Sequence, residues 1–116
     1  MKTVKFGNTG MDVTPICLGA MSFGDPEKWT HDWVLKEDDS RKIIKRALDL
    51  GINFFDTANI YSKGESERIL GRALKDYADR EKIVVASKVY FDIHDGPNAK
   101  GLSRKSILHE IDQTLK

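Results

Sequence analysis

Three polar side chains, Asp56, Tyr61 and Lys88, follow apolar segments of the chain and are of types that together can carry out chemistry. Asp56 ends the apolar run 52–55, Lys88 ends the run 83–87, and Tyr61 lies five residues after Asp56. A tyrosine beside a lysine can protonate a carbonyl oxygen, because the lysine charge favours the developing phenolate. A carboxylate behind the lysine would keep it charged and oriented. These three are therefore the candidate catalytic residues.

The elements that must position these side chains follow from the apolar periodicity of the chain. Residues 3–16 predict a β-hairpin, because 8–10 is a short turn whose residues tolerate positive φ. Strand and helix patterns then alternate, and we expect one β/α unit in each of the ranges 16–50, 52–78 and 82–116. The strands are nearly continuous apolar runs, which predicts a parallel sheet buried on both faces.

Three helices are indicated by capping residues and by apolar faces. Ser40 is expected to cap the first helix, Gly51 to end it, and Ser103 to cap the third. We expect the apolar face of each helix to pack on the sheet. These faces comprise Ile43, Ile44, Ala47 and Leu48 in the first helix, Ile69, Leu70, Ala73, Leu74 and Tyr77 in the second, and Ile107, Leu108, Ile111 and Leu115 in the third.

Composition and charge restrict the class of protein. The chain has 116 residues, of which 40% are hydrophobic and 32% charged, and its net charge is +1 with no basic stripe. We therefore expect no nucleic-acid partner and no membrane partner, since no apolar stretch approaches the roughly 20 residues of a membrane helix. The single cysteine, Cys17, fits a reducing compartment and is expected to be a small core residue. Cytoplasmic localisation is the resulting prediction.

Two folds share the predicted order of elements. An open doubly wound sheet suits 116 residues by size, but it normally carries a glycine-rich nucleotide-binding turn after its first strand. The turn at 19–24 matches neither the dinucleotide fingerprint nor the P-loop. The second fold is a (β/α)8 barrel, and in both folds functional groups gather at the C-terminal ends of the strands. Asp56 and Lys88 are therefore expected neighbours, whereas the pattern alone leaves the choice of fold open.

The run 51–61, followed by 64–74, strongly resembles the signature of the aldo-keto reductase family, and the segments 6–10, 18–21 and 84–88 resemble that family too. The resemblance implies an α/β fold, specifically a partial (β/α)8 TIM barrel with an N-terminal β-hairpin, three parallel strands and three helices. Typical barrels need about 250 residues. The chain is thus expected to match the first three β/α units of such a barrel.

The resemblance also implies a reaction, the NADPH-dependent reduction of a small carbonyl compound such as an aldehyde, ketone or sugar. Tyr61 would be the proton donor, Lys88 would support its phenolate, and Asp56 would hold Lys88 in place. Family members often have glycine directly after this tyrosine, whereas here Ser62 follows and the glycine comes at Gly64.

The cofactor site implied by the resemblance is only partly represented. Ala20 and Met21, together with Asp56, would lie at the nicotinamide end of NADPH. A fourth catalytic residue, a histidine on the next strand, and most of the grip on the cofactor's phosphates and adenine would lie beyond Lys116. We expect no bound metal, because His31, His94 and His109 are dispersed without metal-ligand spacing. Trp29 and Trp33 are assigned equally to a substrate pocket or to loop packing.

Three hypotheses follow for the 116-residue chain. The favoured one is the N-terminal piece of an NADPH-dependent reductase that is inactive by itself. The second is an enzyme completed by another chain or by self-association, since three parallel strands would leave unpaired edges. The third is a non-catalytic assembly module that retains the motif by descent.

Overall fold

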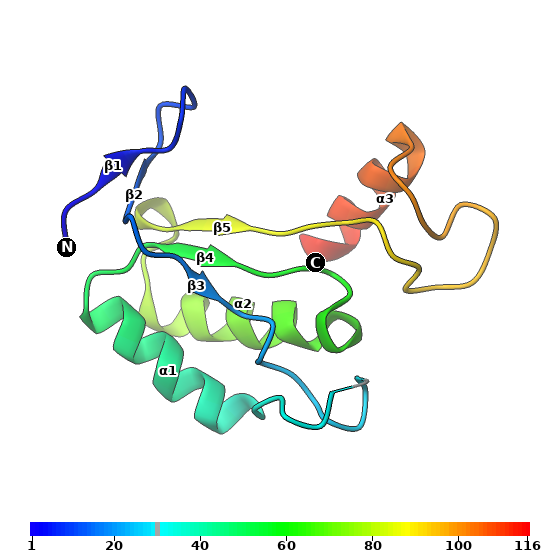
Figure 1. Ribbon diagram of the computed structural model, residues 1–116, viewed down its shortest axis with the longest axis horizontal. Coiled ribbons are helices and arrows are strands. Elements are labelled where there is room, and N and C mark those ends of the chain that lie inside the picture. The colour runs from blue at the N-terminus through cyan, green and yellow to red at the C-terminus, as the bar shows by residue number, and fades with distance from the viewer. Residues whose placement is uncertain (30) are drawn as a thin grey trace.

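The structure, a computed structural model, describes residues 1–29 and 31–116 and begins with the predicted β-hairpin (Figure 1). Strand β1 (Val4–Lys5) pairs antiparallel with β2 (Asp12–Val13). The turn between them needs positive φ at Gly7 (55°) and Gly10 (81°), and the Lys5 Nζ to Asp12 Oδ2 ion pair of 2.8 Å links the two strands. Glycine supplies these backbone angles without steric cost, which explains the position of the turn.

A three-stranded parallel sheet forms the centre of the molecule, as predicted. Its order is β3 (Leu18–Gly19), β4 (Phe54–Asp56), β5 (Val84–Ala86), and Gly19 lies opposite Asp56 in the register. All three strands run in one direction, so their C-terminal ends meet at one edge of the sheet (Figure 1). This edge carries the candidate catalytic residues.

Helices α1 (Glu37–Asp49) and α2 (Glu65–Tyr77) lie on the same side of the sheet, whereas α3 (Arg104–Thr114) lies apart, beyond the C-terminal ends of the strands (Figure 1). Two 3-10 helices, η1 (Tyr61–Gly64) and η2 (Arg80–Lys82), precede α2 and β5. Among the residues that the structure describes, no helix combines the length and the apolarity needed to cross a membrane.

The hydrophobic core lies between the sheet and the helix pair α1 and α2. Phe55 of β4 is fully buried, and it clusters with Ile44 of α1 and Leu70 of α2. On the opposite side of β4, Phe54 meets Phe6 of the hairpin turn edge-to-face, with ring centroids 5.3 Å apart. The remaining residues of β4 and β5 are only half-buried and Gly19 of β3 is exposed, so the prediction of a sheet buried on both faces was wrong. The reason is that helices cover a single face.

The expectation that Ser40 caps α1 was wrong, because α1 begins at Glu37. Ser40 lies in the first turn, where its buried hydroxyl donates to the carbonyl oxygens of Leu35 (3.0 Å) and Lys36 (2.8 Å). The acidic run 37–39 is favourable at a helix N-terminus, and the helix starts four residues earlier than a cap at Ser40 would place it.

The other two helix-end predictions were confirmed by the structure. Gly51 has φ of 82° directly after α1, and the Ser103 hydroxyl caps α3 by accepting a hydrogen bond from Ser106 N at 3.1 Å. The position of Cys17 differs from expectation, because this residue is exposed rather than in the core.

The predicted apolar faces agree with the structure in part only. In α2 the core face is confirmed except for Tyr77, which is exposed at the end of the helix. In α3 the expectation was wrong, because the helix buries Ser106 and Glu110 instead of its apolar residues. The apolar residues that α3 exposes are Ile107, Leu108 and Ile111, followed by Leu115 after its last turn.

A polar network joins α1 to α2 at the solvent edge of the core. Arg72 donates two hydrogen bonds to the Glu37 carboxylate, at 3.0 and 2.7 Å. Arg41 bonds to Asp76 and, through Nε, to the Tyr77 hydroxyl at 3.1 Å. The hydrogen bonds from Arg72 hold the pKa of Glu37 below its ordinary value, against a smaller opposing effect of burial.

Candidate active site

The structure brings Asp56, Tyr61 and Lys88 together at the C-terminal edge of the sheet. Lys88 Nζ lies 2.6 Å from Asp56 Oδ2 and 3.4 Å from the Tyr61 hydroxyl oxygen. The strand register explains the first contact, because Asp56 ends β4 and Lys88 follows the neighbouring strand β5. The predicted proximity of the three residues is therefore present in the structure, although their catalytic roles stay a prediction.

The Lys88 ammonium uses all three of its hydrogens. Besides Asp56 and Tyr61, it donates to the carbonyl oxygen of Thr57 at 2.8 Å, and an ammonium group has three donors and no acceptor. Burial alone would lower the pKa of Lys88, but the hydrogen bonds to Asp56 and Tyr61 and the charge of Asp56 together outweigh burial and raise that pKa. Lys88 is thus held as a cation beside the phenol.

Tyr61 is positioned by hydrogen bonds that continue the sheet beyond its strands and by a tight turn. Thr57 N donates to Ala86 O (2.9 Å) and Asn59 N donates to Lys88 O (3.2 Å), so the loop after β4 follows the segment after β5. Tyr61 N then donates to the carbonyl oxygen of Ala58 at 3.2 Å, which begins η1.

The residues after Tyr61 adopt the left-handed conformation that the missing glycine would favour. Ser62 has φ of 47° and Lys63 has φ of 51°, and Gly64 continues at 89°. A left-handed residue other than glycine costs roughly 1–2 kcal/mol. Within the described residues, the buried Ser62 hydroxyl also has no hydrogen-bond partner. In this turn the cost of the left-handed conformation therefore falls on Ser62 and Lys63.

A close approach between two loops fixes the turn after Tyr61 from the other side. Gly24, in the loop after β3, packs so tightly on Ser62 that an added Cβ would overlap the serine side chain. The next nearest atom to that Cβ would be Val34 Cγ2, at an ordinary 3.8 Å. Ser62 is therefore the neighbour that requires glycine at this position.

The residues predicted at the nicotinamide end of the cofactor differ in exposure. Ala20 is fully buried, and its N–H donates to Asp56 O at 2.8 Å while its carbonyl oxygen accepts from Ser66 Oγ at 2.6 Å. Met21 is 38% exposed. In the part of the chain that the structure describes, Asp56 Oδ1 has no hydrogen-bond partner, unlike Oδ2. Exposed atoms of Met21 and Asp56 are thus available to a ligand, whereas the Ala20 side chain shapes the core beneath them.

A cavity of about 740 Å³ adjoins Tyr61 and has partly aromatic walls. Trp29 and Phe91 line it together with Tyr61, and the rings of Trp29 and Tyr61 are 6.3 Å apart, edge-to-face. Trp33 does not line this cavity, because its ring stacks on His31 at 4.7 Å and remains half exposed. The same two roles are predicted for both tryptophans from the sequence, but their surroundings in the structure differ.

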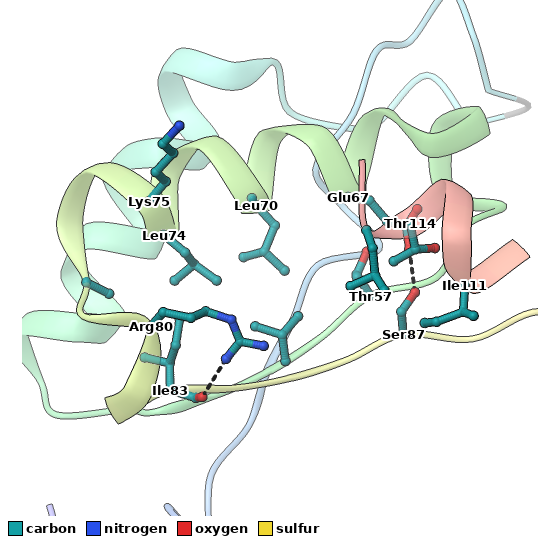
Figure 2. A pocket seen from close by; sticks show the side chains of 14 residues that line it. Thr57, Glu67, Leu70, Leu74, Lys75, Arg80, Ile83, Ser87, Ile111 and Thr114 are labelled. Atoms are coloured by element: carbon teal, nitrogen blue, oxygen red, sulfur yellow. Dashed lines mark hydrogen bonds between the residues drawn. The ribbon is translucent and has the colours of Figure 1, made fainter.

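A second cavity, of about 520 Å³, lies between α2 and the β5 side of the sheet, with α3 at one end, and none of the three candidate catalytic residues lines it (Figure 2). Leu70 and Leu74 of α2 line one side of it, Arg80 and Ile83 lie opposite, and Ile111 of α3 lies at one end. At one end, Glu67 Oε1 accepts hydrogen bonds from Ser87 Oγ (2.5 Å) and Thr114 Oγ1 (3.0 Å). The Thr114 hydrogen bond thus joins α3 to α2, and the Ser87 hydrogen bond joins the segment after β5 to α2.

The histidines are less dispersed than the sequence indicates. The rings of His94 and His109 lie 5.3 Å apart, and both contact Glu110. Sequence reasoning missed this group because 15 positions separate the two histidines. The adjacent pair His109 and Glu110, on a predicted helix that His94 precedes, was the only available signal.

Comparison with known proteins places this geometry in context. The chain is 39% identical over 136 aligned residues to the aldo-keto reductase AMT2 of Alternaria alternata, covering 97% of this chain and 36% of that protein. It is 36% identical to the versiconal hemiacetal acetate reductase of Aspergillus parasiticus, covering 100% of this chain and 38% of that protein. The chain therefore spans about a third of the length of these relatives.

Solved structures agree with the sequence comparisons. An aldo-keto reductase from Bacillus halodurans, in its holo form, superimposes with a TM-score of 0.77 at 30% identity, over 99% of this chain and 35% of that one. A thermostable aldo-keto reductase in complex with the inhibitor epalrestat superimposes with a TM-score of 0.75 at 28% identity, over 99% and 38% of the two chains. These are TIM-barrel enzymes, so the predicted partial barrel is confirmed. The sequence model of the Aldo/keto reductase family matches residues 15–116, and the chain belongs to that family.

Proposed function

We propose that this chain carries the proton-donating site of an NADPH-dependent reductase that acts on a small carbonyl compound. The observation that carries the proposal is the arrangement of Lys88, whose ammonium contacts Asp56 Oδ2 at 2.6 Å and the Tyr61 oxygen at 3.4 Å. Family membership supports carbonyl reduction in general. The residue roles, the cofactor and the substrate are the parts that we propose.

The direction of the hydrogen bonds indicates how Tyr61 would act. Lys88 donates to the phenol oxygen, so the Tyr61 hydroxyl hydrogen is left to point toward a substrate carbonyl. When that hydrogen moves to the carbonyl oxygen, the resulting phenolate lies next to a fixed positive charge. Because the pKa of Lys88 is raised, this charge persists at neutral and mildly alkaline pH. Asp56 positions the ammonium.

The exposed groups at this edge of the sheet fit the nicotinamide end of NADPH. Asp56 Oδ1 can accept a hydrogen bond from a ribose hydroxyl while Oδ2 holds Lys88, and Met21 offers an apolar surface beside it. NADPH, when bound, supplies the hydride. The chain's own residues orient the carbonyl and hold or release the proton at the Tyr61 oxygen.

The cavity beside Tyr61 favours an aromatic or long apolar carbonyl substrate. Trp29 and Phe91 form flat walls next to the phenol. A small sugar would use these walls less well than an aryl aldehyde.

We infer that activity needs polypeptide beyond these 116 residues. This inference is supported by the half-covered sheet and by the exposed apolar side chains of α3, such as Leu108 (49% exposed) and Ile107 (40%). The alternative is that a second copy or another chain covers these surfaces, which would make self-association a condition for activity. If the chain were instead a non-catalytic assembly module, it would self-associate but would not bind NADPH.

The test is NADPH oxidation with a panel of aryl, alkyl and sugar aldehydes. We would assay the chain alone and a chimaera in which residues 1–116 replace the matching part of the Bacillus halodurans reductase. We expect an inactive chain and an active chimaera. In the chimaera, Tyr61→Phe should abolish turnover and Lys88→Met should slow it by more than about tenfold, whereas Tyr77→Phe, on the far end of α2, should change little. Full turnover by Tyr61→Phe would refute the assignment of the proton donor.

A further inference from the structure

We propose that His94, His109 and Glu110 form a binding site for a divalent transition-metal ion of the Zn²⁺ type, separate from the Tyr61 site. One ligand atom from each of the three residues lies within 4.8 Å of the others. His94 belongs to the long segment between β5 and α3, while His109 and Glu110 belong to α3. Imidazole and carboxylate are the ligands that Zn²⁺ takes in three-residue protein sites.

The hydrogen bonding of His94 leaves its second ring nitrogen pointing at a carboxylate. His94 Nδ1 lies 3.1 Å from the carbonyl oxygen of Asp95, and a carbonyl oxygen only accepts, so Nδ1 must carry the hydrogen. In the neutral ring, Nε2 is then a bare acceptor. It lies 3.1 Å from Glu110 Oε1, which is also an acceptor. Two acceptors at this distance require a cation between them, either a proton or a metal ion.

The surroundings of Glu110 favour a positive charge at this place. Its side chain is only 5% exposed, and Asn59 Nδ2 donates to its second oxygen, Oε2, at 3.2 Å. In residues 1–29 and 31–116, neither lysine nor arginine pairs with this carboxylate. A buried carboxylate is costly unless it is paired or binds a metal. The neutral Asn59 orients Glu110, so that Oε1 faces the two histidines.

His109 distinguishes a metal ion from a simple proton bridge. Its Nε2 lies 4.0 Å from the same Glu110 oxygen, so three potential ligands surround one point. Tetrahedral Zn²⁺ with bonds near 2.0–2.2 Å places its ligand atoms roughly 3.3–3.5 Å apart. The His94 to Glu110 distance of 3.1 Å is slightly shorter than this range, so a small shift would admit the ion, and His109, with a side chain that is 53% exposed, can rotate inward. The exposed side would leave one coordination position to water.

Such an ion would fix α3 to the rest of the molecule. It would join the segment after β5 to α3 through His94, and it would act through Glu110 on Asn59. The N–H of Asn59 donates to Lys88 O at 3.2 Å, next to the Tyr61 site. The site would therefore hold α3 in place and is not itself part of the proposed proton transfer.

The experiment measures metal binding by the full 116-residue chain, purified without a histidine tag. Zn²⁺ binding is followed by isothermal titration calorimetry, and the absorption spectrum of bound Co²⁺ reports the ligand geometry. The variants are His94→Gln, His109→Gln and Glu110→Gln, and the matched control is His31→Gln, which removes a histidine outside the group. Circular dichroism checks the fold of each variant.

We expect one Zn²⁺ per chain and a Co²⁺ spectrum typical of four ligands. His94→Gln and His109→Gln should each weaken binding by at least about tenfold, since ligand loss exceeds the roughly 10–100-fold effect of an outer-shell change, and His31→Gln should bind like the parent. Because both histidines are exposed, their variants decide the matter even when Glu110→Gln does not fold. Zn²⁺ binding that is absent, or that is unaffected by His94→Gln, would overturn the proposal and leave a proton between His94 and Glu110.

Discussion

Helices α2 and α3 both follow a strand of the parallel sheet, yet they are held by opposite kinds of contact. Helix α2 buries apolar residues such as Ile69 and Leu70 against the sheet. Helix α3 buries two polar residues, Ser106 and Glu110, and leaves its apolar residues at the surface. The same alternating pattern of strand and helix thus produces one helix that belongs to the core and one that is attached by hydrogen bonds.

The connections to the strands explain the difference. Residues 57–64 lead directly from β4 into α2, and they include the tight turn that holds Tyr61. Residues 87–103 form a long excursion before α3, so the helix starts beyond the C-terminal ends of the strands (Figure 1). The candidate catalytic residues depend on the first connection and on the strand ends, and α3 contributes no residue to the core cluster beneath them.

The largest expected effect is the difference in stability loss between a substitution in the core and a substitution on α3. Phe55→Ala should lower the free energy of unfolding by about 3–5 kcal/mol, because it leaves a cavity where a fully buried ring packs between α1, α2 and the sheet. Leu108→Ala on α3, at 49% exposure, should change it by less than about 0.5 kcal/mol. Urea unfolding measures both. Equal losses would contradict the division of the chain into core and attached helix.

The next effect concerns local opening of the two helices. Amide hydrogens of α3 should exchange with solvent faster than those of α2, because few buried apolar contacts resist the opening of α3. Glu67→Ala should widen this difference, since Glu67 accepts from Thr114 of α3 and from Ser87. Hydrogen exchange followed by NMR gives the rates. Slower exchange in α3 than in α2 would show that its exposed apolar face is covered in solution.

A smaller effect lies in the connection that leads into α2. Gly24→Ala should cost about 1–3 kcal/mol, the usual penalty of overpacking, because the new Cβ meets the Ser62 side chain. Ser62→Gly should remove both this clash and the left-handed serine, so Gly24→Ala should be nearly neutral in that background. Thermal unfolding of the two single variants and the double variant gives the coupling. Additive losses would show that Ser62 is not the obstacle.

The smallest effect is the pH dependence of the link between α1 and α2. Because the folded pKa of Glu37 is lowered, its contribution to stability is present above the unfolded value of about 4.3 and is lost as pH falls through the lower folded value. Glu37→Gln should therefore cost at most about 1 kcal/mol at neutral pH, since the pair with Arg72 is partly exposed. In acid the variant and the parent should converge. If the difference in stability between Glu37→Gln and the parent stayed constant as the pH falls, the charge of Glu37 would not be the source of its contribution.

Local patterns in the sequence predict the parts of the molecule that depend on near neighbours. The end of β4 at Asp56, the position of Lys88 just after β5 and the glycine after α1 follow from short-range signals, and the family signature adds Tyr61. The prediction that Ser40 caps α1 was wrong because the helix begins with the acidic residues before it. The burial of Glu110 was not predictable, because it depends on Asn59, which lies 51 residues earlier. Burial in α3 is decided by the path of 87–103, which has no periodic signal.

The contact between Gly24 and Ser62 has a consequence for how this part of the family can diverge. As long as serine follows Tyr61, any side chain at position 24 meets it, so glycine is favoured at position 24. A lineage that first acquires glycine at position 62 loses this restriction, and the loop after β3 then becomes free to vary. The two positions should therefore change in a fixed historical order, with 62 before 24.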